Sequence, residues 1–418
     1  MSPGAVAVTG LGLVTAAGLG TEENWSRACA GTSTAATDPE LAEMPVDFSC
    51  RVPSFDADAL IGRRSTMTQD PFIRFAMVAA DEAIADSGLD PGTWDGARVG
   101  VVLGVGIGGL ASYDTQQRRL RGTGPSAVSP LLVPMLVPNM AAGHLALRFG
   151  ALGPNFVTAT ACASGATAIG CALGLLRGGT CDVVITGGAE AAVVPLLAAS
   201  FARMGALSRR TGDPAAASRP FDTDRDGFVL GEGSGILVLE REAHALARGA
   251  RIRGRLAGYG ASADAHHITA PDPGGDGVAR AITAALTDAG VDASDVGHVN
   301  AHGTSTPLND VAEARVLRRV IGGHAAVTSI KGAVGHTLGA AGAIEAVFTV
   351  LALERGVIPP TANLEKQDPQ IELDIVSDTA RSHAAEVAIS NSFGFGGQNA
   401  VLVFTAGARG PGRGGRDS

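Results

Sequence analysis

The sequence predicts a layered α/β protein. Short β-rich runs that end at glycine alternate with longer alanine-rich stretches of helical periodicity. Several of the β-rich runs are continuously apolar, which is typical of strands that are buried on both faces. The chain has 418 residues, of which 45% are hydrophobic, so it can bury a large core. Its 58 glycines are spread among aliphatic residues, which indicates tight turns and close backbone approaches rather than low complexity.

Seven β-rich runs are expected to form strands, and three stretches with helical periodicity that end at glycine are expected to form helices. The strands are predicted at 5–15, 99–109, 182–190, 233–242, 298–304, 326–332 and 387–404, and the helices at 72–88, 162–177 and 277–290. Similar runs occur on both sides of about residue 250, so the pattern leaves open a duplicated fold. The tail at 407–418 consists mostly of Gly, Pro and Arg and is predicted to be disordered.

Composition argues against several classes of protein. The net charge is −9 and no basic run occurs, so we expect no nucleic-acid partner. The five cysteines are an odd number without metal-ligand spacing, which indicates neither a disulfide framework nor a zinc site. No apolar run reaches the length of a membrane span, and the first basic residue is Arg27, so neither a membrane segment nor a signal peptide is expected. We therefore expect a cytoplasmic protein.

One motif suggests a nucleotide. Gly104, Gly106 and Gly109 match the GxGxxG pattern of dinucleotide-binding turns directly after an expected strand. That pattern also requires an acidic residue about 20 positions further on, at the end of a second strand. A polar stretch follows here instead, so we do not expect a nicotinamide site.

Cys162 lies where a β-branched run gives way to an alanine-rich one, so we expect it at or near the first turn of a helix. Free backbone N–H groups and the helix dipole stabilise a thiolate there, and the pKa of such a cysteine can fall well below 8.5. The same N–H groups can hold an oxyanion. The alternative is a small buried side chain that only packs.

Two histidines occur in Gly- and Thr-rich turn sequence after expected strands, where catalytic side chains are commonly presented. They are His302, in NAHGTSTPLND, and His336, which follows Lys331 by five residues and precedes Glu345 by nine. Taken alone, each is also compatible with a structural role.

Five long motifs together resemble the β-ketoacyl-acyl carrier protein synthases. They are TACASG with Cys162, RPFDTDRDGFVLGEG at 219–233, NAHGTSTPLND with His302, IKGAVGHTLGAAGAIE with Lys331, His336 and Glu345, and NSFGFGGQN at 391–399. The chain looks most like the elongating synthase II type and the ketosynthase subunits of bacterial type II polyketide synthases, over nearly its whole length. The resemblance implies a thiolase fold of two similar halves, at 1–250 and 251–406, that form an α-β-α-β-α core.

The resemblance also implies an acyltransferase that makes carbon–carbon bonds. Cys162 would hold the acyl chain as a thioester. His302 and His336 would donate N–H groups to the malonyl thioester oxygen and stabilise the enolate as carbon dioxide leaves. Lys331 is expected near His336, where its charge would keep that imidazole neutral. The backbone N–H groups of Cys162 and Phe395 would form an oxyanion hole for acyl transfer.

Supporting positions follow from the same resemblance. Phe395 is expected to act as a gate, Thr304 and Thr306 to bind the phosphopantetheine arm, and Glu345 and Asn399 to support the site. Four residues match positions that can surround a monovalent cation, namely Asn300, Glu345, Ser390 and Asn399. The acyl pocket matches Ile107 and Phe201, with Leu131 and Leu132 supplied by a partner subunit.

The implied partner is acyl carrier protein, whose phosphopantetheine arm carries the substrates, and no further cofactor is expected. Arg63 and Arg64 match basic positions that meet the carrier protein, whereas Met67 and the residues after it depart from the basic pattern of relatives. Fatty-acid and polyketide pathways both stay open, as do a homodimer and a heterodimer with a chain-length factor. The alternative is a non-elongating subunit that only decarboxylates malonyl-carrier protein or only dimerises, which the intact Cys, His, His set disfavours.

Overall fold

The strand order repeats in the two halves of the chain. The computed structural model describes residues 5–407, so all but the first residue of the tail predicted to be disordered lies outside the described residues. Ten strands of a 12-stranded mixed sheet follow the order β6-β5-β7-β8-β1 in the first half and β11-β10-β15-β16-β9 in the second. The other two are β2, which pairs with β1, and β13, which pairs with β11. In both sequences the first three strands are parallel neighbours and the last three are antiparallel neighbours. This repeat confirms the duplicated fold that the resemblance implied.

The halves meet where β9 pairs with the start of β1. The strands of the first half are β1 (Val6–Thr15), β5 (Val99–Gly104), β6 (Asn155–Thr158), β7 (Val183–Glu190) and β8 (Gly233–Arg241). Those of the second half are β9 (Gly254–Ala263), β10 (Val296–Asn300), β11 (Ala326–Thr328), β15 (Val387–Gly394) and β16 (Gln398–Ala406).

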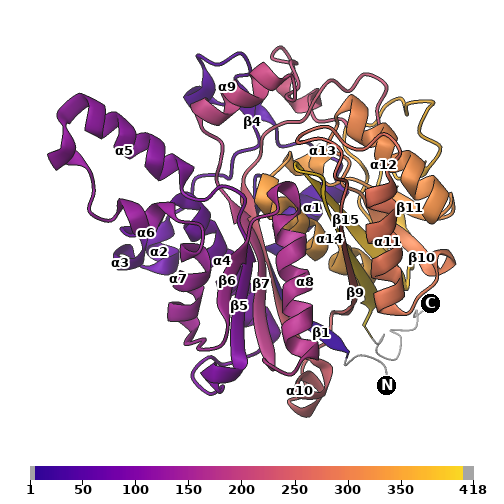
Figure 1. Ribbon diagram of the computed structural model, residues 1–418, viewed down its shortest axis with the longest axis horizontal. Helices are drawn as coiled ribbons and strands as arrows, with labels where there is room; N and C mark the ends of the chain where they lie inside the picture. The colour runs from indigo at the N-terminus through magenta and orange to yellow at the C-terminus, as the bar shows by residue number, and fades with distance from the viewer. Residues whose placement is uncertain (1–4, 408–418) are drawn as a thin grey trace, which may run out of the picture.

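Helices cover the strands in three layers, which Figure 1 shows from left to right. Apolar side chains of α4 (Pro71–Ser87) and α7 (Met140–Phe149) pack on the outer face of the first half. Helices α8 (Ser164–Arg177) and α14 (Ala341–Arg355) lie between the two sets of strands and share one core with both. Helices α11 (Asp276–Ala289) and α12 (Pro307–Val320) cover the outer face of the second half. The order of layers is therefore α-β-α-β-α, as expected.

Helix α14 was not among the predicted helices, and its burial explains why. All of its residues except Glu354 and Arg355 are buried. A helix that is apolar all round has no polar face, so the amphipathic periodicity that identifies surface helices is missing.

Two predicted strands differ in the structure. The run at 387–404 forms an antiparallel hairpin of β15 and β16, with Phe395 and two glycines between them. Gly396 and Gly397 take φ values of 85° and 70°, which glycine adopts without strain. The run at 326–332 leaves the strand after Thr328 and turns into helix α13 (Lys331–Val334). Both changes occur where the chain carries residues of the candidate site.

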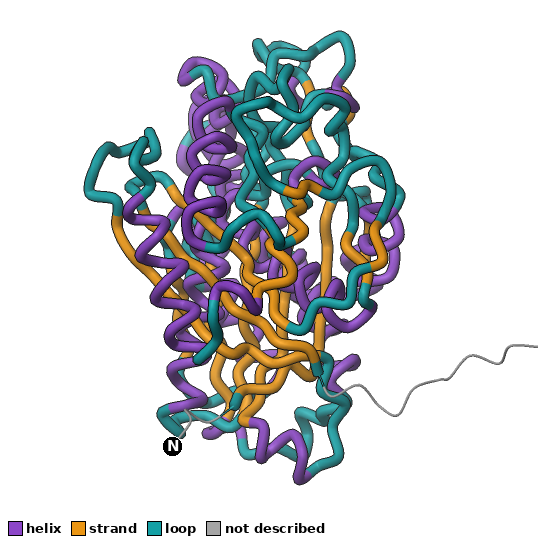
Figure 2. Tube along the Cα trace, turned by 90° about the vertical axis from the view of Figure 1, so that its right-hand side faces the viewer, coloured by secondary structure: helices purple, strands orange, loops and turns teal. Residues whose placement is uncertain are grey.

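The remaining elements surround this core, and Figure 2 shows long loops above the strands. Helices α5 (Leu110–Thr123) and α6 (Leu132–Leu136) project from the first half in Figure 1. The further helices are α1 (Thr21–Cys29), α2 (Ala57–Ile61), α3 (Arg63–Thr66), α5 (Leu110–Thr123), α6 (Leu132–Leu136), α9 (Pro195–Met204) and α10 (Glu242–Ala247). The further strands are β2 (Gly18–Leu19), β3 (Ala36–Thr37), β4 (Phe48–Ser49), β12 (Val357–Ile358), β13 (Asp374–Ile375) and β14 (Arg381–Ser382). None of the helices within residues 5–407 is long and apolar enough to cross a membrane.

Candidate active site

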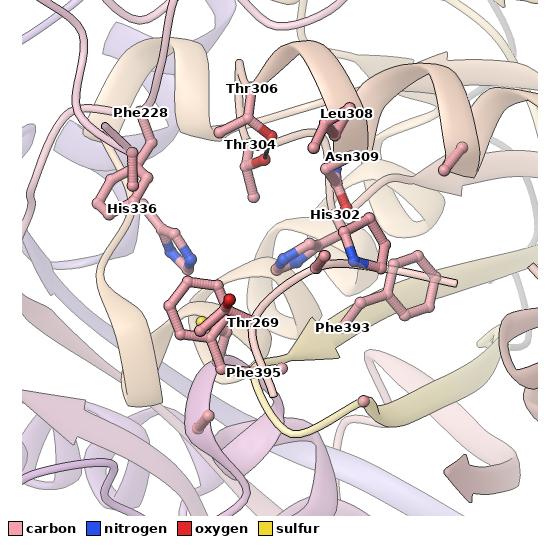
Figure 3. A pocket seen from close by; sticks show the side chains of 18 of the residues that line it. Phe228, Thr269, His302, Thr304, Thr306, Leu308, Asn309, His336, Phe393 and Phe395 are labelled. Atoms are coloured by element: carbon pink, nitrogen blue, oxygen red, sulfur yellow. Dashed lines mark hydrogen bonds between the residues drawn. The ribbon is translucent and has the colours of Figure 1, made fainter. Parts of the chain in front are cut away.

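A cavity of about 590 Å³ brings Cys162, His302 and His336 together. Cys162 follows β6, His302 follows β10, and His336 follows the turn of α13 after β11. Loops at the carboxyl ends of parallel strands are where α/β proteins place their ligands. The rings of the two histidines lie 5.5 Å apart between centroids and are nearly perpendicular, and Figure 3 shows both pointing into the space between them.

Cys162 is fixed in a tight turn. It occupies the 3₁₀ turn η4 (Ala161–Ala163) directly before α8, which agrees with the position predicted at the start of a helix. Ala161 takes a φ of 50°, a left-handed conformation that costs energy for a residue with a side chain. The Ser164 hydroxyl donates to the Ala161 carbonyl at 2.6 Å and accepts from the Thr160 N–H at 2.9 Å. These bonds hold the strained turn and aim the thiol into the cavity.

The predicted lowering of the Cys162 pKa is wrong. Burial raises the pKa of the Cys162 thiol to about 11, although the Lys331 charge and a hydrogen bond from the Phe395 N–H oppose this rise. The whole Cys162 residue is only 9% exposed, so few water molecules can solvate a thiolate there. Cys162 is therefore a thiol at neutral pH, and it must lose its proton in the reaction itself.

Both histidines are neutral and carry their proton on Nε2. Lys331 Nζ lies 3.4 Å from His302 Nδ1, and the Leu338 N–H donates to His336 Nδ1 at 3.3 Å. We assign each Nδ1 as an acceptor, which leaves the Nε2–H of each ring as a donor. Burial and the Lys331 charge hold the pKa of both imidazoles well below the usual value. The cavity thus offers two neutral N–H donors.

Lys331 contacts His302 directly, and its charge also acts on His336 as predicted. Its ammonium donates to the His302 carbonyl at 2.6 Å and forms a buried ion pair with Glu345. The sequence spacing placed Lys331 close to His336, but the turn of α13 directs its side chain toward β10. Its charge still lowers the pKa of both rings, as expected.

The chain passes very close to Cys162 at Gly394. A Cβ atom at this glycine would lie 2.5 Å from the Thr160 carbonyl oxygen and 3.2 Å from the Cys162 nitrogen. The next residue, Phe395, directs its backbone N–H at the thiol. The backbone N–H groups of Cys162 and Phe395 are therefore close to each other, as an oxyanion hole requires.

Aromatic side chains surround the histidines and the thiol. The ring of Phe395 lies 6.5 Å from that of Phe201, which in turn packs edge-on against Phe228 at 5.3 Å. Phe228 also packs edge-on against His336, and Phe393 against His302. These contacts limit the orientations of both imidazoles.

Of the predicted acyl-pocket residues, Ile107 and Phe201 line the cavity. Leu131 is exposed and Leu132 is half-buried at the start of α6, and neither borders the cavity of this single chain. Thr304 and Thr306, the predicted phosphopantetheine ligands, also line the cavity and lie across it from Phe395 in Figure 3. Their hydroxyls lie 2.9 Å apart.

Family models match most of the chain. The β-ketoacyl synthase N-terminal domain matches residues 4–245, and the β-ketoacyl synthase C-terminal domain matches residues 253–365. The chain belongs to the β-ketoacyl synthase family. It is 47% identical over 404 residues to the 3-oxoacyl-[acyl-carrier-protein] synthase 2 of Synechocystis sp., an alignment that covers 96% of this chain and 97% of the relative.

Solved structures of ketosynthases share the fold of this β-ketoacyl synthase. The ishigamide ketosynthase/chain length factor aligns with a TM-score of 0.91 and 34% identity, covering 97% of this chain and 100% of that one. A type II PKS acyl-carrier protein in complex with its ketosynthase bound to the hexaketide gives a TM-score of 0.89 and 33% identity over the same shares. The resemblance found in the sequence and the thiolase fold are thus confirmed.

Three of the four residues predicted around a cation fit that purpose. Asn300 Oδ1, Glu345 Oε2 and Ser390 Oγ are buried oxygens that find no hydrogen-bond partner within residues 5–407. Asn300 and Ser390 are paired across β10 and β15, and Asn300 bonds to the backbone of Glu345. These three side chains would hold a monovalent cation beside the Lys331–Glu345 ion pair, and the cation would satisfy the three oxygens.

Asn399 does not belong to this group. Its amide donates to Asp264 at 2.6 Å and to Ser262 at 3.3 Å, on the side of the sheet that α11 covers. Neighbouring β16 residues alternate between the two faces of the sheet, so Asn399 is directed away from α14. Its predicted role beside the cation is therefore wrong, although it does line the main cavity.

Two buried glutamates were missed in the sequence. Glu313 accepts hydrogen bonds from the N–H groups of His302 and Gly303, both at 2.8 Å, and so fixes the backbone of the first histidine. Glu190, at the end of β7, accepts from backbone N–H groups in two loops and also lines the cavity. The only sequence signal for Glu190 is an acidic residue that ends an apolar strand.

The hydrogen bonds of Glu190 also bear on the GxGxxG match, which resembles a dinucleotide-binding turn. The loop of the GxGxxG match directs the N–H groups of Gly106, Ile107 and Gly108 at Glu190. The amides that would cradle a phosphate in a dinucleotide site already have a carboxylate as their acceptor.

Proposed function

We propose that this β-ketoacyl synthase condenses an acyl chain held on Cys162 with malonyl-acyl carrier protein. The observation that supports the proposal best is one cavity that combines a thiol, two backbone N–H groups beside it and two neutral imidazoles with Nε2–H donors. The first pair of donors suits acyl transfer, and the second pair suits an enolate. No cofactor takes part, since the phosphopantetheine arm of the carrier protein brings both substrates.

In the first step, Cys162 Sγ attacks the thioester carbonyl of the acyl-carrier protein. The oxygen becomes negatively charged and is held by the backbone N–H groups of Cys162 and Phe395. The bond to the phosphopantetheine sulfur then breaks, and the proton lost by Cys162 ends on that sulfur. This transfer avoids a free thiolate, which the raised pKa of Cys162 makes costly.

In the second step, the malonyl thioester oxygen accepts hydrogen bonds from His302 Nε2 and His336 Nε2. The C–C bond to the carboxylate breaks and carbon dioxide leaves. The electron pair of that bond stays on the substrate and forms the enolate. The enolate carbon attacks the thioester on Cys162, the C–S bond breaks, and Cys162 takes up one proton from solvent. Neutral imidazoles favour this step because they stabilise the new charge without protonating the carbon.

The carrier protein would reach the cavity past the hydroxyls of Thr304 and Thr306. Both line the cavity and have the donor capacity to bind the amides of a phosphopantetheine arm. Arg63 and Arg64 in α3 and the basic residues Arg118, Arg119 and Arg121 of α5 supply positive charge for an acidic carrier protein.

We further propose that the enzyme acts in the cytoplasm as a dimer. Strand β6 ends the sheet, and its residue Phe156 is exposed there. Large apolar side chains are also exposed at α6, on α7 and in the turn between α7 and β6, namely Leu131, Val133, Leu147 and Leu152. Unpaired strand edges and apolar patches of this kind are usually covered. A partner subunit bound at this edge would bring Leu131 and Leu132 of this chain against the partner. The partner would be a second copy of the chain or a chain-length factor.

Fatty-acid elongation is the pathway that we favour. Identity reaches 47% with a curated synthase 2 but 33% with the type II PKS ketosynthase complex aligned above. The test is intact-protein mass spectrometry after mixing with carrier proteins that bear saturated or polyunsaturated chains, with Cys162→Ala as the control. Loading of saturated chains onto Cys162 by the chain alone supports elongation of fatty acids. Loading that needs a partner or a β-keto chain supports the polyketide pathway, and equal labelling of Cys162→Ala contradicts the mechanism.

A further inference from the structure

Glu190 connects two loops of the site through a single carboxylate. Its side chain is fully buried at the end of β7. Oε2 accepts from the Gly106 N–H at 2.9 Å and from the Gly339 N–H at 3.2 Å. Oε1 accepts from the N–H groups of Ile107 and Gly108, each at 3.2 Å. The loop after β5 and the loop after His336 are thus hydrogen-bonded to the same group.

Backbone amides are the main partners of this carboxylate. Glu190 forms no ion pair among the side chains that the structure describes, and burial raises its pKa to about 7 despite the four N–H donors. A buried carboxylate without a basic neighbour is costly unless its hydrogen bonds are kept. The two loops therefore cannot move away from Glu190 independently without losing part of this stabilisation.

The packing around Glu190 requires glycine in both loops. A Cβ atom at Gly106 or at Gly339 would lie 2.6 Å from Glu190 Oε2. At Gly339 the same atom would also lie 2.3 Å from the Gly106 nitrogen, so the two loops touch each other beside the carboxylate. This close approach shows that Glu190 fills the junction between them.

Each loop leads to a different part of the cavity. The first carries Ile107, which lines the cavity where the acyl chain is expected. The second carries Leu338, whose N–H donates to His336 Nδ1 and so keeps the proton on Nε2. Glu190 is bonded to Ile107 itself and to the residue after Leu338. One side chain thereby fixes the distance between the acyl pocket and one enolate donor.

We propose that Glu190 is a positioning residue that couples the Ile107 loop to the His336 loop. The coupling aligns the thioester on Cys162 with the enolate that attacks it. The alignment of thioester and enolate rests on the proposed condensation. The coupling of the two loops depends only on hydrogen bonds within this chain.

Glu190→Gln tests the proposal, because the amide keeps the size of the side chain but replaces one accepting oxygen by a donor. Glu232→Gln is the control for the loss of a buried carboxylate elsewhere in the fold, one that also lies 3.8 Å from Arg51. Glu232 is also a buried glutamate whose pKa burial raises to about 7, and it accepts the Val52 N–H, but it does not line the main cavity. Glu190→Asp is the second variant, since its shorter side chain keeps the charge but cannot reach both loops.

The first measurement is hydrogen–deuterium exchange in peptides that cover 104–110 and 336–342. Both peptides are expected to exchange at least about tenfold faster in Glu190→Gln and to stay unchanged in Glu232→Gln. Faster exchange in neither peptide, or in one alone, overturns the coupling. If Glu190→Gln does not fold, the same criterion applies to Glu190→Asp.

The second measurement separates the two half-reactions. In Glu190→Gln we expect loading of long acyl chains to fall by about tenfold more than loading of short ones, and malonyl decarboxylation to fall by about tenfold. A stable variant with unchanged chain-length preference and unchanged decarboxylation overturns the positioning role. Exchange needs no substrate, so a wild-type enzyme that fails to load acyl chains contradicts the proposed function without deciding the coupling.

Discussion

Lys331 Nζ lies 3.4 Å from Nδ1 of His302 and donates to the carbonyl of the same residue at 2.6 Å. The ammonium also pairs with Glu345, and all three side chains are at most 3% exposed. One buried cation therefore fixes the ring, the backbone and the tautomer of His302. Its positive charge keeps the imidazole neutral, which leaves Nε2–H free to donate to the enolate in the proposed condensation.

Lys331→Met should destabilise the protein and slow decarboxylation. Removing the cation leaves Glu345 buried without its partner, which typically costs about 3 to 5 kcal/mol. Urea denaturation measures this loss of unfolding free energy. In the double variant Lys331→Met/Glu345→Leu the unpaired carboxylate is gone, so most of the stability should return. Malonyl decarboxylation should stay low in both, and its recovery in the double variant would mean that Lys331 acts only on stability.

His302→Ala and His336→Ala should separate the two half-reactions. Each removes one N–H donor to the enolate, and the loss of one such donor costs about 10²- to 10³-fold in rate. Acylation of Cys162 uses the backbone N–H groups instead, so its rate should change by less than about threefold. Stopped-flow loading and carbon dioxide release measure the two steps. An equal fall in both would show that the histidines also act in acyl transfer.

The residues inside the motifs could be predicted from the sequence, because each motif combines a chemical group with the glycines or threonines of its turn. The prediction held for Cys162, His302 and His336, which all line one cavity. Contacts that depend on the direction in which a side chain points could not be predicted. Lys331 is close to His336 along the chain, but the orientation of a short helix decides that it bonds to His302.

Asn399 was misplaced because its face of the sheet depends on strand register. One residue of shift moves a side chain to the opposite face, and the sequence alone did not reveal the hairpin of β15 and β16. Glu190 was missed because its partners are backbone amides, which leave no side-chain pattern to recognise.

The reactivity of Cys162 should rise steeply with pH. With a pKa raised to about 11, only about one thiol in ten thousand is ionised at pH 7. Because the thiolate is the nucleophile, the rate of alkylation by iodoacetamide should increase about tenfold for each pH unit between 7 and 9, without a plateau. Mass spectrometry of the Cys162 peptide measures this rate. A plateau below pH 8 would show that the helix start lowers the pKa after all.

Gly394→Ala should slow acyl transfer more than Gly396→Ala does. The new Cβ at position 394 would meet the Thr160 carbonyl at 2.5 Å, so the chain must shift and take the Phe395 N–H away from the thiol. Loss of one oxyanion donor predicts a fall of about 10²-fold in the loading rate. At Gly396 the φ of 85° makes alanine costly by about 1 to 2 kcal/mol, but the nearest atom belongs to the flexible Gln398 side chain. Gly396→Ala should therefore lower the melting temperature while its loading rate stays within about threefold of wild type. Equal loading rates in the two variants would show that the Phe395 N–H does not belong to the oxyanion hole.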